Sequence, residues 1–114
     1  GHNDAKTIEE SFRKDFTKTK VDYIFFRNIF THITDNFKRL KDSVHRSAEL
    51  ELFGIQNIET MEENILLLSL AENELENTHK NILIDEAVRL SKKFGADNSY
   101  KFINATLEKI LESN

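Results

Sequence analysis

The sequence predicts an all-α protein, a helical bundle of about five helices around one core. Proline is absent and glycine occurs only three times in 114 residues, so helices should be long and tight turns few. Apolar residues also recur every three or four positions along most of the chain, which is the period of an amphipathic helix. A chain of this length buries one modest core. We therefore expect one helical domain over residues 21–114, preceded by an N-terminal segment over residues 1–20.

The N-terminal segment carries one short amphipathic pattern. Ile8, Phe12 and Phe16 lie four residues apart with charges between them, so residues 5–16 can form a helix. A helix of this length is marginal unless it packs on something. The chain opens Gly-His without an initiator methionine, and we expect this dipeptide to be a cloning remnant, with the natural start upstream.

A strong helical pattern follows over about residues 22–47. It predicts one amphipathic helix, or two in line. The apolar residues at helical spacing are Phe26, Ile29, Phe30, Ile33, Phe37, Leu40 and Val44. Residues 49–59 contain a glycine and are predicted to be a connection with a partly buried turn around Leu52, Phe53 and Ile55.

The third helix is predicted to be the central one. Thr60 and Glu63 have the spacing of a capping box, in which two side chains satisfy free amides at a helix start. Most of the residues over 65–70 are apolar, so that nearly every side of this helix is apolar. Such a helix should be the most buried of the five.

Two further helices complete the predicted bundle. Asn77 and Thr78 supply a break before a helix over about residues 79–94, and Gly95 follows where a left-handed C-cap residue belongs. The last helix should cover about residues 98–112 and bury one stripe of its surface. The stripe residues are Phe102, Ile103, Thr106, Leu107 and Ile110.

The joint between the last two helices interleaves lysines with aromatic residues. Its lysines, aromatics and glycine are Lys92, Lys93, Phe94, Gly95, Tyr100, Lys101 and Phe102. Lysines attract phosphate, aromatic rings are platforms for unpaired bases, and glycine lets a ligand approach the backbone, so the joint suits single-stranded RNA. A structural reading is also open, in which Phe94 and Phe102 are core residues. In that reading one of Asp97, Asn98 and Ser99 caps the last helix.

Charge is unevenly distributed along the chain. The net charge of −4 argues against bulk attraction to nucleic acid. Residues 47–79, however, hold eight acidic side chains and no lysine or arginine. The eight are Glu49, Glu51, Glu59, Glu62, Glu63, Glu72, Glu74 and Glu76. Such a block favours a basic partner, although glutamates commonly do no more than solvate helix faces.

No pattern in the sequence is typical of a catalytic or metal site. The four histidines share no helix face with carboxylates at ligand spacing, and neither a phosphate-binding glycine loop nor a nucleophile elbow is present. The chain has no cysteine, which fits a cytoplasmic protein. No apolar run approaches the roughly 18 residues of a membrane span. We therefore expect no enzyme, no cofactor, no metal and no membrane contact.

Three stretches resemble, in order, the NusB family of bacterial transcription antitermination factors. Residues 22–30, Asp-Tyr-Ile-Phe-Phe-Arg-Asn-Ile-Phe, are similar to the family's "D…YFR.LL" helix. Residues 54–66 are similar to its "LG…ERAIL" stretch, and residues 84–104 to its "INEAVELAKKFG…SxKFVNG" ending. The resemblance implies an all-helical protein that pairs with NusE, a ribosomal small-subunit protein. It also implies binding to the boxA element of nascent RNA, within an RNA polymerase antitermination complex.

The resemblance also implies site residues. The family's RNA-facing loop corresponds to Phe94, Gly95, Asp97, Asn98, Ser99, Lys101 and Phe102. A partner-facing acid corresponds to Glu62, and we expect its neighbour Glu63 at the same interface. No counterpart is seen for the family's arginine-rich first helix, and Leu67 and Ala105 stand where the family commonly has arginine and glycine. The chain therefore resembles a divergent or N-terminally truncated member.

Without that first helix, one apolar stripe should lack cover. Its residues are Phe26, Ile29, Phe30 and Phe37. Exposed patches of this size usually become interfaces, so we expect either a homodimer or cover from residues 5–16. Two other functions stay open: a NusB-like accessory domain of a ribosomal RNA methyltransferase, and a helical protein-interaction module without RNA binding.

Overall fold

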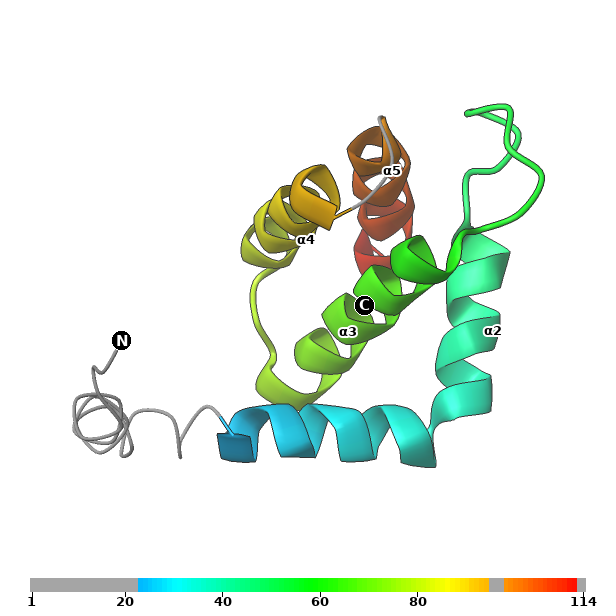
Figure 1. Cartoon of the computed structure of the whole chain (residues 1–114). Helices are drawn as coiled ribbons and strands as arrows, with labels where there is room; N and C mark the ends of the chain where they lie inside the picture. The colour runs from blue at the N-terminus through cyan, green and yellow to red at the C-terminus, as the bar shows by residue number, and fades with distance from the viewer. Residues whose placement is uncertain (1–22, 95–97, 113–114) are drawn as a thin grey trace, which may run out of the picture.

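The computed structural model describes residues 23–94 and 98–112, and within these ranges the chain is all-α, with no strand. A helix covers residues 23–35, and four labelled helices follow it in Figure 1. These are α2 (Phe37–Ser47), α3 (Thr60–Glu76), α4 (Lys80–Phe94) and α5 (Ser99–Glu112). The predicted all-α bundle is confirmed. The helix predicted over residues 5–16 and the C-cap predicted at Gly95 lie outside the described residues.

The chain turns sharply at Asn36, between the helix over residues 23–35 and α2 (Figure 1). The prediction of one helix, or two in line, is wrong in this respect. Asn36 has φ −122° and ψ 22°, and its Nδ2 donates a hydrogen bond to the backbone carbonyl of His32 at 3.0 Å. The backbone N–H of Asn36 donates to the same carbonyl at 3.0 Å, so the side chain adds a second bond to it. Asparagine is favoured where helices break because its side chain can bond nearby backbone, and here the chain turns without glycine or proline. The turn lets Leu40 and Val44 reach the core, where both are fully buried.

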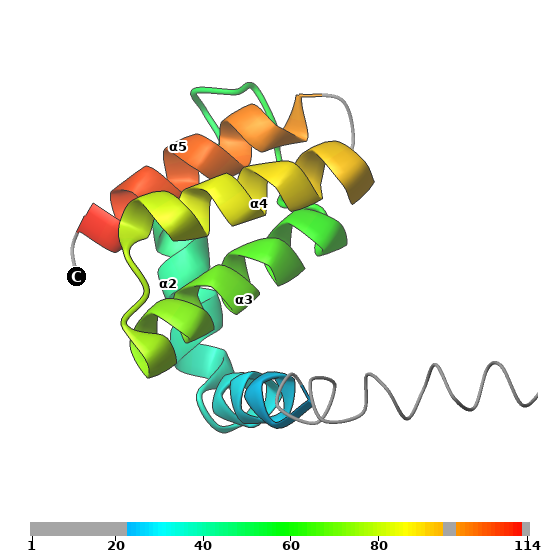
Figure 2. The same cartoon turned by 90° about the vertical axis from the view of Figure 1, so that its left-hand side faces the viewer.

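The central helix is α3, as predicted. Its core-filling side chains are Ile65, Leu66, Leu67, Leu70 and Ala71. The helices α2, α4 and α5 all pack against it. α4 and α5 also lie side by side (Figure 2), and the ion pair between Lys80 of α4 and Glu108 of α5, at 3.1 Å, shows that they are antiparallel. The stripe predicted for α5 is buried throughout. No helix within the described ranges is long and apolar enough to cross a bilayer.

The N-terminal cap of α3 differs from the prediction by one residue. Thr60 is the first helical residue and Glu59 is the N-cap. The Oε1 atom of Glu62 accepts a hydrogen bond from the backbone N–H of Glu59 at 3.0 Å, so the acid of the capping box is Glu62 and not Glu63. Two successive glutamates made the register ambiguous in the sequence. At the other end, Asn77 takes the left-handed conformation with φ 54° and ends the helix.

The connection between α2 and α3 turns at Gly54, whose φ of 63° lies in the left-handed region that favours glycine. Phe53 and Ile55 are partly buried against the core, as predicted. The ring of Phe53 meets that of Phe102 edge-on, with 6.1 Å between ring centres. The prediction is wrong for Leu52, whose side chain is 69% exposed. Successive side chains of a tight turn point to different sides, and here Phe53 takes the inward position.

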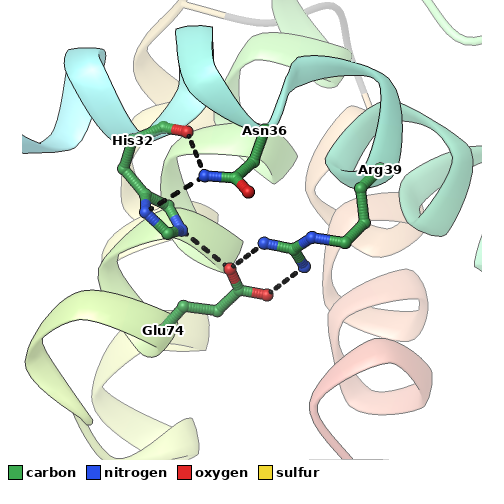
Figure 3. Close-up of polar contacts among 4 residues, drawn as sticks. All are labelled: His32, Asn36, Arg39 and Glu74. Atoms are coloured by element: carbon green, nitrogen blue, oxygen red, sulfur yellow. Dashed lines mark hydrogen bonds and ion pairs between the residues drawn. The ribbon is translucent and has the colours of Figure 1, made fainter.

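Three helices meet at a carboxylate near the end of α3. Glu74 accepts two hydrogen bonds from the guanidinium of Arg39, both at 2.8 Å, and its Oε1 lies 2.8 Å from Nε2 of His32. Figure 3 shows these side chains converging from α2, the preceding helix and α3. The hydrogen bonds from Arg39, and secondarily His32, lower the pKa of Glu74 to about 2. We call His32, Arg39 and Glu74 the clamp, because they hold both sides of the Asn36 turn onto α3.

Candidate nucleic-acid interface

The exposed part of the predicted RNA-facing surface lies at the end of α4 and the start of α5. Phe94, the last residue of α4, is 57% exposed, and Nζ of Lys93 lies 5.3 Å from its ring centre. Asn98 and Lys101 are also exposed. Gly95 and Asp97, which the sequence assigned to the same surface, lie outside the described residues. The sequence left open whether Phe94 was a core residue, and its exposure places it outside the core.

Two other predicted RNA-facing residues are buried. Phe102 is only 2% exposed and belongs to the core. Ser99 is also buried, and its Oγ donates a hydrogen bond to Oε2 of Glu62 at 2.6 Å. In this conformation neither side chain has a surface that RNA could touch. Both have a structural role, because Phe102 lies on the buried face of α5 and Ser99 bonds the start of that helix to α3, and a direct RNA contact by either stays a prediction.

Glu62, predicted to face a partner, is 6% exposed. Its Oε1 accepts from the backbone of Glu59 at 3.0 Å and its Oε2 from Ser99 at 2.6 Å, so both oxygens have a donor. The residue links the start of α3 to the start of α5. A hollow of about 260 Å³ opens beside this link, between Asn57 of the connection and Asn98, which directly precedes α5. Glu62 therefore stabilises the contact between these two helix starts, and its role at a partner interface stays a prediction.

Part of the acidic block is used within the chain. Oε2 of Glu63 lies 2.6 Å from Nε2 of His45. Glu49 pairs with Lys109 of α5 at 3.5 Å, and Glu74 belongs to the clamp. Glu51 and Glu76 are exposed, and neither forms an ion pair with a residue that the structure describes. The acidic surface left for a partner is therefore smaller than the count of eight suggested. In the same described ranges, no group of three or more His, Cys, Asp or Glu side chains could hold a metal ion.

The cations at one end of the α4–α5 pair form ion pairs, whereas those toward the other end form none with a described residue. At one end, Lys80 pairs with Glu108 at 3.1 Å and Lys109 with Glu49 at 3.5 Å. Toward the other end lie four exposed cations that we call the cation cluster: Lys92, Lys93 and Lys101 at the joint, and Arg89 about one and a half turns before the end of α4. Among residues 23–94 and 98–112, none of the four has an ion-pair partner. Unneutralised cations beside an exposed aromatic ring are typical of a surface that binds phosphate and bases.

An apolar groove of about 530 Å³ lies between the helix over residues 23–35, α3 and α4. Its apolar walls include Phe25, Phe26, Leu68 and Leu90. Three of the four stripe residues expected to lack cover are exposed, namely Phe26, Phe30 and Phe37. The expectation is wrong for Ile29, which is buried and lines the same groove as Ile65. Whether a second copy or residues 5–16 cover this face stays a prediction.

The chain is similar to known proteins along almost its whole length. The chain matches the NusB family over residues 2–112. A transcription antitermination protein NusB from Haemophilus influenzae (strain 86-028NP) is 34% identical over 110 residues, which cover 95% of this chain and 74% of the relative. The protein of the same name from Proteus mirabilis (strain HI4320) is 33% identical over 110 residues, covering 94% of this chain and 77% of the relative. No solved structure matches the chain significantly. The resemblance inferred from three sequence stretches is thus confirmed along almost the whole length, and the chain belongs to the NusB family.

Proposed function

We propose that the protein is a transcription antitermination factor, a non-catalytic adaptor that binds boxA-type single-stranded RNA together with ribosomal protein NusE. It would act within the RNA polymerase antitermination complex, in the bacterial cytoplasm. Family membership and the names of the relatives support the antitermination role. RNA and NusE are the ligands that the sequence resemblance implies. The observation that carries the RNA part is the cation cluster beside the exposed ring of Phe94.

The size of the cation cluster sets the expected strength of RNA binding. Each phosphate neutralised on a single strand contributes about −0.7 to the slope of log affinity against log salt. Four cations therefore permit a slope no steeper than about −3. This is fewer phosphate contacts than the roughly 6–10 of proteins with strongly salt-dependent binding, so we expect a partner to reinforce the affinity. We expect boxA-type RNA to bind weakly alone and more tightly with NusE.

Titrations of Lys101→Ala test this RNA surface. If Lys101 neutralises one phosphate, its loss should lower affinity for every RNA sequence and flatten the salt slope by about 0.7. Lys80→Ala is the matched control, because Lys80 pairs with Glu108 at the opposite end of the same helix pair. Equal affinity and an equal slope for Lys101→Ala and the wild type would remove this residue from the interface.

The acidic surface supports a basic partner, but the residue chosen for the test matters. Glu62→Lys would place a cation in a buried, fully hydrogen-bonded position and would disturb the fold itself. Glu63 lies only partly buried, so Glu63→Lys is the better test of the predicted NusE interface. Loss of a charge pair costs about 2–5 kcal/mol at a buried interface position and less at a rim. Unchanged NusE affinity, with helicity retained, would take Glu63 out of the interface.

Two rival functions predict different outcomes. An accessory domain of a ribosomal RNA methyltransferase would be encoded in a reading frame that continues into a catalytic domain. A protein-interaction module without RNA binding is favoured by one observation, the apolar groove beside the exposed phenylalanines. Absence of any salt-sensitive RNA binding, with or without NusE, would favour the module.

A further inference from the structure

Tyr100 lies between cations from two helices. Its ring is partly exposed near the start of α5. Nζ of Lys92, from the last turn of α4, is 4.7 Å from the ring centre, and Nζ of Lys101 is 5.9 Å away. Both distances fall within the roughly 6 Å reach of a cation–π contact. The tyrosine is therefore an aromatic surface in direct contact with two members of the cation cluster.

We propose that Tyr100, and not Phe102, is the base-stacking residue of α5, and that Lys92 and Lys101 bind phosphates flanking the stacked nucleotide. The proposal rests on the proposed function, because it assigns residues to the same RNA surface. The ring of Phe102 is buried in the core, so in this conformation it offers no face to a base. Phe94, at the end of α4 and in contact with Lys93, would be the second platform. Each helix then contributes one aromatic ring with lysine beside it.

The local charge indicates what kind of ligand fits. Along the sequence, residues 87–107 contain four cations and a single acid, Asp97, and in space the buried Glu62 also reaches the start of α5. A protein partner would have to bring carboxylates to these cations but would not need a flat ring between them. A nucleic acid brings both phosphates and flat bases, and a base is free to stack on a side chain only in a single strand. The combination of Tyr100 with Lys92 and Lys101 therefore favours single-stranded RNA over an acidic peptide.

The contact seen between Lys92 and Tyr100 is one that RNA can replace. An exposed cation–π contact changes an equilibrium only about two- to fivefold. Stacking a base on an aromatic side chain is worth about 5- to 150-fold. The flexible four-carbon stem of lysine lets the ammonium move from the ring face to a phosphate next to the stacked base. Binding thus exchanges one weak contact for a stacked base and a charge pair.

Matched substitutions at Tyr100 separate the ring from the hydroxyl. Tyr100→Phe keeps the ring and should bind boxA-type RNA within about twofold of the wild type, whereas Tyr100→Leu should bind about 5- to 150-fold more weakly. Lys92→Ala should flatten the salt slope by about 0.7. Because Tyr100 is partly exposed, unchanged melting temperatures are expected and should be measured alongside.

A scan with abasic RNA adds a readout that a structural role would not move. Removing one base at a time from the probe leaves every phosphate in place. For the wild type, one position should be as damaging as Tyr100→Leu, and that same position should cost nothing further in the Tyr100→Leu protein. If the wild type binds RNA and Tyr100→Leu binds equally well, the proposal is wrong while the proposed function stands. If the wild type binds no RNA even with NusE, the proposed function fails and the assignment of Tyr100 fails with it.

Discussion

Replacing Glu74 by glutamine removes the charge of the clamp while keeping its shape. The pKa of Glu74 is about 2 in the folded protein, against an ordinary 4.5. In full, that difference would correspond to about 3 kcal/mol of stability at neutral pH. The Glu74 side chain is 25% exposed, however, and that of Arg39 is 54% exposed, so solvent screens much of the attraction. We therefore expect Glu74→Gln to lose about 1–2 kcal/mol.

The pH dependence identifies the source of the loss. Because folding lowers the pKa of Glu74, its contribution is complete above pH 4.5 and disappears as pH falls from 4.5 toward 2. Urea unfolding should show the difference between wild type and Glu74→Gln at pH 7, with most of it gone by about pH 2.5. The control is Glu76→Gln, on the same helix but exposed and in no ion pair with a described residue. The same loss at both pH values, or an equal loss in the control, would refute the electrostatic account.

Three further predictions concern the core, the joint and the apolar face. Phe102→Ala should lower the free energy of unfolding by about 3–5 kcal/mol, whereas Phe94→Ala, at an exposed position, should change it by less than about 0.5 kcal/mol. If Phe94 were the core ring, Phe94→Ala would lower the melting temperature more than Phe102→Ala. Ser99→Ala should cost about 1–3 kcal/mol, because it leaves one oxygen of buried Glu62 without its donor; a loss near zero in urea unfolding would mean that water replaces the hydroxyl. For the apolar face, sedimentation should show either a concentration-dependent dimer that Phe26→Asp abolishes, or a monomer. If it is a monomer, residues 5–16 should be protected from proteolysis. A monomer that is cleaved rapidly within residues 5–16 would contradict both forms of cover.

Local signals predicted most of the fold. The sequence predicts α3, α4 and α5 because each combines a helical apolar period with a break or a cap near its end. The turn at Asn36 was missed because the apolar period of the first two helices continues across it and neither glycine nor proline marks it. At this turn the carbonyl of His32 accepts from both the side chain and the backbone N–H of Asn36, a contact that the sequence pattern does not reveal.

The candidate site was less predictable, because it depends on contacts between distant residues. Glu62 and Ser99 are 37 positions apart, so nothing near either residue indicated that they share a buried hydrogen bond. Phe94 and Phe102 carry similar local signals, and only tertiary packing shows that Phe102 is the core ring. Tyr100 was among the aromatics of the joint, and its position off the buried stripe of α5 and before Lys101 already favoured exposure, but the family resemblance did not include it among the site residues.

The uneven pairing of cations along the α4–α5 pair also affects the rate at which RNA associates with the protein. α4 has 15 residues and is therefore about 22 Å long, which separates the neutralised cations at its start from the cation cluster at its end. At about 0.01 M salt the Debye length is roughly 30 Å, so an approaching RNA experiences the net charge of −4 and is repelled. At about 0.15 M the Debye length is roughly 8 Å, so RNA near the cluster is shielded from more distant charges, including Glu72, Glu74 and Glu76 near the end of α3. The association rate should therefore pass through a maximum at intermediate ionic strength, where repulsion is screened and local attraction still orients the encounter.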